Sequence, residues 1–190
     1  MSFPEIAAAV TIGALSLGIG APSVGSALRS WRLNGAVRDM ALEMHRTRME
    51  AVARGTYVGI VFDRSAPTDR WRLYADGGDR GIQTAEVAAG IDRPLGDPLS
   101  LASRHEGVRI GIAGAGPIPR IPPAIGTLSP SDDPIAFGST DIFSASPTGE
   151  TSTGTLYLTD GRDMRAVVVY GATGRIRTWR FDARDGQWRQ

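Results

Sequence analysis

The sequence predicts an α+β fold in which one long N-terminal helix packs on a small antiparallel β-sandwich. The first observation behind this prediction is an uncharged stretch, residues 6–28, that leads directly into an amphipathic segment ending at Gly55. The second is that the rest of the 190-residue chain carries short β-rich runs separated by turn sequences. We therefore expect a helical part over residues 1–54 and a β-rich globular domain over residues 55–190.

The first half of the helix is predicted to span a membrane. Residues 6–28 carry no ionisable group, and as a helix they would cover roughly 30 Å, the thickness of a bilayer's hydrocarbon core. Glu5 precedes the stretch, at a depth where a carboxylate is tolerated. Pro22 removes one backbone hydrogen bond and should kink or loosen the helix. A plain membrane anchor or an uncleaved signal segment is the alternative, although the stretch has no basic start.

The second half of the helix is predicted to be amphipathic. Its apolar residues recur at helical spacing and form one stripe, namely Val37, Met40, Ala41, Met44 and Ala51. Its charged residues lie mostly away from that stripe, namely Arg38, Asp39, Glu43, Arg46 and Glu50. Gly55 is placed to end the helix.

The remainder is predicted to form two small antiparallel sheets that pack on each other and on the second half of the helix. Runs rich in β-branched and aromatic residues predict strands at 57–62, 71–74, 108–112, 135–137, 155–158, 166–170 and 176–181. Turn sequences at 160–161, 172–174 and 185–186 predict hairpins between consecutive strands. Six prolines between residues 113 and 134 predict an exposed loop.

Composition argues against an enzyme and against a bound metal or other cofactor. The chain has no cysteine, so a thiolate metal site is excluded. Its two histidines, His45 and His105, have no second His or Cys at metal-binding spacing, and we expect both on the solvated surface. The sequence Asp76-Gly77-Gly78-Asp79 lacks the later ligands of a calcium loop. With a net charge of +1, global charge does not steer the chain to nucleic acid.

The helical stem resembles the N-terminal segment of mature type IV pilins and pseudopilins. In that family a Glu lies four residues after the first residue and a Pro lies seventeen residues beyond it, the spacing of Glu5 and Pro22. Further segments are similar to the GspH/FimT branch of minor pseudopilins: residues 36–63, 71–74, 142–143, 147–149 and 173–177. The resemblance covers most of the chain and is weakest between about residues 85 and 135.

The resemblance implies a non-catalytic minor subunit of a type II secretion pseudopilus or of a type IV pilus, two systems that it does not separate. The position of Glu5 favours the mature form, with Met1 as the methylated first residue left by a prepilin peptidase, over the alternative of a chain made without a leader. The stem would be stored in the lipid of the bacterial inner membrane as a single span, with the globular domain in the periplasm. Other pilins or pseudopilins and an inner-membrane assembly platform are the implied partners. Met1, Glu5 and Pro22 are the expected assembly residues, with Glu5 neutralising the N-terminal amine of the adjacent subunit.

A DNA-binding minor pilin for DNA uptake is the alternative function. Arg175 and Arg177 are two residues apart in an expected strand, so they project from one face together with Trp179. Two guanidinium groups and an indole could grip phosphates and stack a base. Gly174, Arg175 and Arg177 also resemble the Gly-Arg-x-Arg motif with which FimT proteins bind DNA. Gly174 is equally explained as a turn residue, and alternating Arg blunts an edge strand against aggregation.

Overall fold

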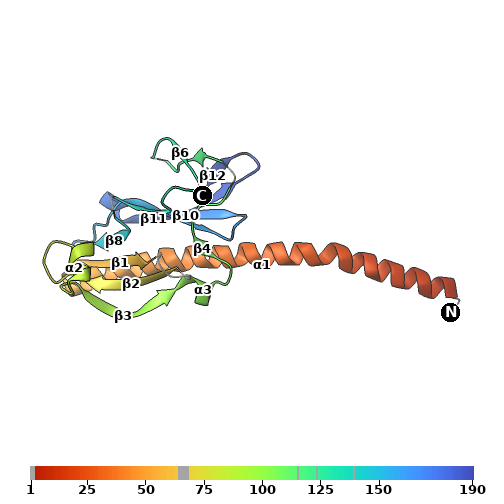
Figure 1. Cartoon of the computed structure of the whole chain (residues 1–190), viewed down its shortest axis with the longest axis horizontal. Coiled ribbons are helices and arrows are strands. Elements are labelled where there is room, and N and C mark those ends of the chain that lie inside the picture. Colours follow the sequence, from red (N-terminus) through yellow and green to blue (C-terminus); the bar gives the residue numbers. More distant parts are fainter. Residues whose placement is uncertain (1–2, 64–68, 115, 123, 139) are drawn as a thin grey trace.

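The computed structural model describes the backbone of residues 3–63, 69–114, 116–122, 124–138 and 140–190, and side chains from residue 25 onward. One helix, α1 (Phe3–Arg54), runs through the whole stem. Figure 1 shows its N-terminal half extending away from the strands and its C-terminal half lying among them. The helix ends as expected, because Gly55 adopts a left-handed φ of 67° and its N–H bonds to Val52 O.

The predicted membrane span falls almost entirely on residues whose side chains lie outside the described part. Across the described residues, no helix is both long enough and apolar enough to cross a bilayer. The span over residues 6–28 therefore stays a prediction.

The first sheet is antiparallel and has the strand order β3-β2-β1-β8. Its strands are β1 (Val58–Asp63), β2 (Arg70–Ala75), β3 (Arg93–Ser100) and β8 (Ile142–Ala145). Two short helices flank β3, α2 (Thr84–Ala88) and α3 (Leu101–Arg104).

The second sheet has the strand order β12-β11-β10-β9-β4, and β7 also pairs with β9. Its strands are β4 (Arg109–Ile110), β7 (Ile135–Phe137), β9 (Gly154–Thr159), β10 (Met164–Tyr170), β11 (Arg175–Asp182) and β12 (Gln187–Arg189). The three hairpins expected between residues 154 and 189 are confirmed, with the 3-10 helix η1 (Gly171–Thr173) inside the second turn.

The main core joins both sheets to α1, which confirms the predicted sandwich. Leu33, Met40 and Met44 of α1 are fully or almost fully buried against residues of both sheets. Phe137 of β7 stacks on Phe62 of β1, with ring centroids 6.4 Å apart, and meets Phe143 of β8 edge-on. The apolar stripe of the helix therefore packs against the sheets and forms the helix side of the core.

The sequence predicted that the proline-rich segment is an exposed loop, and this prediction is wrong in part. Its strands β5 (Ile118–Pro119) and β6 (Thr127–Leu128) form a two-stranded ribbon. Ile121 and Leu128 are buried on the outer face of the second sheet, in what we call the outer cluster, whose buried members are Ile112, Ile121, Leu128, Tyr157, Met164, Ala166 and Val168. The prolines are compatible with this ribbon because its strands are only two residues long.

Strand β3 was not predicted, because Pro94, Gly96 and Pro98 argue against a strand. It is tolerated because β3 is the edge of its sheet, and its pairing with β2 is irregular between Trp71 and Leu73. There Gly96 takes a φ of 80°, and its carbonyl accepts a hydrogen bond from Arg72 Nε at 2.9 Å. Helices α2 and α3 and strand β8 also went unpredicted, and of β12 only the turn before it was predicted.

Candidate functional site

The side chains of the expected assembly residues lie outside the described part of the stem. Met1 is not described, and the side chains of Glu5 and Pro22 are not described either. The backbone of α1 continues as helix through position 22. The roles expected for these three residues stay predictions.

The residues of the Gly-Arg-x-Arg segment lie where the second turn enters β11. Gly174 follows η1 in a left-handed conformation, with φ of 60°. Arg175, Arg177 and Trp179 alternate along β11 opposite Tyr170, Val168 and Ala166 of β10. Val168 and Ala166 belong to the outer cluster. The expected common face is therefore present, and it is the face turned away from α1.

The two arginines and the tryptophan of this face differ in accessibility. Arg175 is exposed, and Arg177 is partly exposed and donates to Gln190 Oε1 at 3.3 Å. Trp179 packs against the outer cluster, and its Nε1 is buried with no hydrogen-bond partner among the described residues. Its ring is therefore partly buried in the core and offers less surface for stacking on a base than a fully exposed indole would. Since β12 pairs only with Arg180–Asp182, the arginine pair lies on a sheet edge in the described chain.

A junction that the sequence did not predict joins the end of α1 to two turns. Arg48 of α1 donates from Nε to the carbonyl of Gly149, at 2.7 Å, in the turn between β8 and β9. Its guanidinium also covers Gly174, in the turn between β10 and β11, where an added Cβ would lie 2.7 Å from Arg48 Cζ. We call Arg48, Gly149 and Gly174 the arginine junction. Both glycines have positive φ, 85° and 60°, so backbone conformation and space both favour glycine here.

The histidine expectation is correct for His45, which is exposed, and wrong for His105. The His105 side chain is only 15% exposed, and its Nε2 lies 2.9 Å from Asp39 Oδ2 on α1. Gly35 of α1 permits this approach, since a Cβ there would lie 3.0 Å from His105 Cε1. His105 thus fastens the segment after α3 to the helix. Sequence spacing carries no signal for this contact, because the residues are far apart in the chain.

Three carboxylates from the segment around α2 lie together, although the sequence indicated no metal site. The oxygens of Asp76, Glu86 and Asp92 are within 4.8 Å of one another. Asp76 accepts hydrogen bonds from the N–H groups of Gly78 and Gly81, and Asp92 accepts from those of Gly77 and Gln83. These bonds give Asp76 and Asp92 the turn-forming role expected of such carboxylates. Glu86 was missed because α2 was not predicted.

Comparison with protein families shows to which family the chain belongs. The family model described as "Type II transport protein GspH" matches residues 36–174. The chain belongs to this family. The resemblance drawn from the sequence is thereby confirmed, and the match includes all three residues of the arginine junction and ends at Gly174.

Solved structures similar to this GspH-family chain are two of the minor pseudopilin EpsH from the type II secretion system of Vibrio cholerae. Both are 15% identical to it over 77% of its length. The matched regions cover 95% and 92% of the two EpsH chains, with TM-scores of 0.44 and 0.43. No curated protein matches the chain. Arg175 and Arg177 lie just beyond the part of this GspH-family chain that the family model matches.

Proposed function

We propose that this chain is a non-catalytic minor pseudopilin that assembles into a type II secretion pseudopilus through α1. The observation that carries the proposal is the GspH family match over residues 36–174, in a chain whose 52-residue helix continues beyond its globular part. The stem would be held in the inner membrane, with the β domain in the periplasm, before the subunit enters the filament. Other pseudopilins, the assembly platform and the prepilin peptidase are the partners that this role requires.

Replacement of Glu5 by alanine tests the assembly role. In the filament core Glu5 would pair with the N-terminal amine of a neighbouring subunit, and such a pair is strong in a low dielectric. We expect Glu5→Ala to stay in the membrane fraction but to be lost from pseudopili. The measurement is cross-linking to other pseudopilins through Ala27→Cys, which introduces the only cysteine of the chain on an exposed helical position.

The control is Glu106→Ala, which removes a carboxylate with 83% of its side chain exposed in the globular part. This variant should assemble like the parent. Normal incorporation of Glu5→Ala would contradict the role given to Glu5. Loss of Glu5→Ala from the membrane fraction would also contradict it, because the defect would then lie in insertion.

DNA binding is retained as a second candidate because Arg175 and Arg177 share an accessible face and a sheet edge. The test is a fluorescence-anisotropy titration of DNA with the full chain in neutral detergent, across a salt series. Binding by the pair predicts that Arg175→Ala/Arg177→Ala weakens affinity and lowers the salt slope by about two. Arg80→Ala/Arg93→Ala, which removes two other exposed arginines, is the charge-matched control. Equal binding by parent and both variants would reject this candidate.

A further inference from the structure

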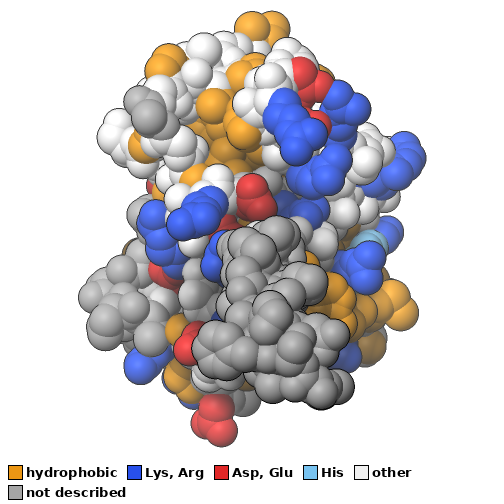
Figure 2. All heavy atoms as spheres, turned by 90° about the vertical axis from the view of Figure 1, so that its right-hand side faces the viewer, with side chains coloured by type: hydrophobic (Ala, Val, Ile, Leu, Met, Phe, Trp, Pro, Cys, Tyr) orange, Lys and Arg blue, Asp and Glu red, His pale blue; other side chains and the backbone are white. Residues whose placement is uncertain are grey.

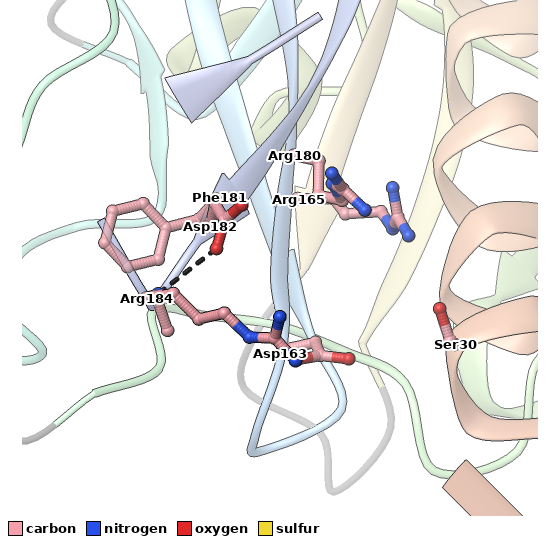
Figure 3. A pocket seen from close by; sticks show the side chains of 8 residues that line it. Ser30, Asp163, Arg165, Arg180, Phe181, Asp182 and Arg184 are labelled. Atoms are coloured by element: carbon pink, nitrogen blue, oxygen red, sulfur yellow. Dashed lines mark hydrogen bonds between the residues drawn. The ribbon is translucent and has the colours of Figure 1, made fainter. Parts of the chain in front are cut away.

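Three arginines converge in a groove between α1 and the second sheet. Arg165 of β10 and Arg180 of β11 are direct partners in the strand register. Figure 3 shows their side chains directed toward α1, with Ser30 on the facing side of the helix. The hollow beside them measures about 430 Å³. A second hollow shares Arg165 and Arg180 with it and is also lined by Arg38 of α1. We call Ser30, Arg38, Arg165 and Arg180 the arginine groove.

The three arginines of this groove have no ion-pair partner among the described residues. No ion pair or hydrogen bond joins the side chain of Arg38, Arg165 or Arg180 to any described residue, and Arg165 Nε is buried without a partner. Like charges that face each other on neighbouring strands are destabilising. The pKa of Arg165 is lowered, first by burial and then by the charges of Arg180 and Arg38, with opposing effects from Asp163 and Asp160.

The acidic residues near the groove do not cancel it. Asp182 lines the hollow, but its carboxylate lies 3.6 Å from Arg189 and accepts the backbone N–H of Arg184. Asp163 also lines the hollow, without coming within ion-pair distance of Arg165. Arg184 adds another cation to the lining. A ligand with a compact negative charge would relieve this arrangement, and guanidinium groups bind phosphate oxygens well.

The groove opens beside the part of α1 that follows the apolar stretch. Ser30 comes two residues after Leu28, and at about 1.5 Å per residue the lining reaches roughly 12 Å further along the helix, from Ser30 to Arg38. Trp31 is 75% exposed and Leu28 is 47% exposed. Exposed tryptophan and arginine just beyond an apolar span are typical of the headgroup region of a membrane. Figure 2 views this side of the molecule and shows arginine side chains gathered on it.

We propose that the arginine groove binds the phosphate of an anionic phospholipid headgroup at the membrane surface while the subunit waits for assembly. The inference rests on the proposed function, since it places the end of the apolar stretch at the bilayer surface. The lipid would neutralise Arg165 and Arg180 and hold the β domain close to the membrane. On entry into a filament the subunit would leave the membrane and release this lipid.

The test follows the arginine Nε–H signals of the ¹⁵N-labelled full chain by NMR in neutral-detergent micelles. We expect short-chain phosphatidylglycerol to shift the signals of Arg38, Arg165 and Arg180 saturably. Phosphatidylcholine and inorganic phosphate should bind at least about tenfold more weakly, because one lacks net negative charge and the other is not concentrated at the micelle. Arg165→Gln/Arg180→Gln, followed at Arg38, should bind phosphatidylglycerol about 30-fold more weakly.

The matched control is Arg175→Gln/Arg177→Gln, which also removes two charges, both from β11 and on the face opposite to Arg180. Its affinity for phosphatidylglycerol should equal that of the parent, and an equal loss in both variants would overturn a specific groove. Equally tight binding of inorganic phosphate, or displacement of the lipid by a short oligonucleotide at lower concentration, would overturn the assignment to lipid. If the chain enters pseudopili but shows no saturable shift, the lipid-binding role of the groove is rejected and the proposed function stands. If the shift is saturable but the chain never enters pseudopili, the proposed function is rejected and lipid binding by the groove stands.

Discussion

At the scale of single residues, the arginine junction shows how one side chain fixes two turns. Arg48 bonds to the carbonyl of Gly149 and covers Gly174, so the ends of two hairpins are held against the same point of α1. Arg48, Gly149 and Gly174 lie in three separate segments that resemble the GspH/FimT branch, 36–63, 147–149 and 173–177. Nothing in their order along the chain indicates that they meet, because their contact depends on how both sheets pack on the helix.

Gly174→Ala should cost more stability than Gly186→Ala. Both glycines have nearly the same positive φ, 60° and 65°, so both variants incur backbone strain of about 1 kcal/mol. Only Gly174 has Arg48 within reach of an added Cβ, whereas the space around Gly186 is open. We expect an additional loss of about 1–2 kcal/mol at Gly174, measured by urea unfolding.

The Arg48→Ala background isolates this additional cost. With the guanidinium removed, Gly174→Ala and Gly186→Ala should become nearly equal, as a double-mutant cycle would show. A persistent difference in that background would mean that the turn itself, and not Arg48, dictates glycine at position 174.

At the scale of secondary-structure elements, α1 owes its place to a buried stripe that the sequence displayed clearly. Val37, Met40 and Met44 were expected on the inner face, and all three are buried. Glu43 was expected away from the stripe, yet it is only 8% exposed, beside the buried Thr47 that bonds to its carbonyl. The stripe is wide because sheets flank the helix on more than one side, which periodicity along the helix does not reveal.

Met44→Ala should destabilise the domain far more than Met49→Ala. Met44 is fully buried between helix and sheets, whereas Met49 is 68% exposed on the same helix. Loss of the buried side chain leaves a cavity, and we expect about 2–5 kcal/mol for Met44→Ala. The exposed control should change the free energy of unfolding by less than about 0.5 kcal/mol. Similar urea midpoints for the two variants would contradict the assigned role of α1 in the core.

The strands divide into those with a local signal and those without one. The hairpins from β9 to β12 could be predicted because Gly161, Gly174 and Gly186 mark their turns and all three have positive φ. Strand β3 could not, because its prolines are acceptable only at a sheet edge, a position set by the other strands. Likewise the arginine groove joins residues of α1, β10 and β11, and only the strand register places Arg165 opposite Arg180.

At the scale of the whole molecule, composition gives the protein an unusually simple alkaline titration. The chain has no cysteine, four tyrosines and no lysine, since all its basic Lys-or-Arg residues are arginine. Tyr157 is buried between the second sheet and the β5–β6 ribbon, and burial raises its pKa despite opposing effects of Arg120, Thr155 and Ile121. Since the folded state then favours the neutral phenol, its contribution to stability is present below about pH 10 and is lost as pH rises.

Tyr157→Phe should flatten the fall in stability above about pH 10, because phenylalanine cannot ionise in the unfolded chain. The measurement is the pH dependence of the free energy of unfolding, with tyrosinate absorbance followed in parallel. The slope is the quantity to compare, since the variant also loses the phenol's hydrogen bonds. An unchanged slope would show that Tyr157 ionises as easily in the folded protein as in the unfolded chain.

The packing of one helix against both sheets also determines how the molecule carries mechanical load. The buried side chains of α1 extend from Leu33 to Ala51, roughly 27 Å along its axis. A pull or push along the stem therefore acts on these contacts in shear, so that all of them resist together instead of separating one after another. The hairpin ends fastened at Arg48 lie at the far end of this contact from the stem. Force applied through the stem would reach the sheets as a distributed load, and the subunit should yield as one unit.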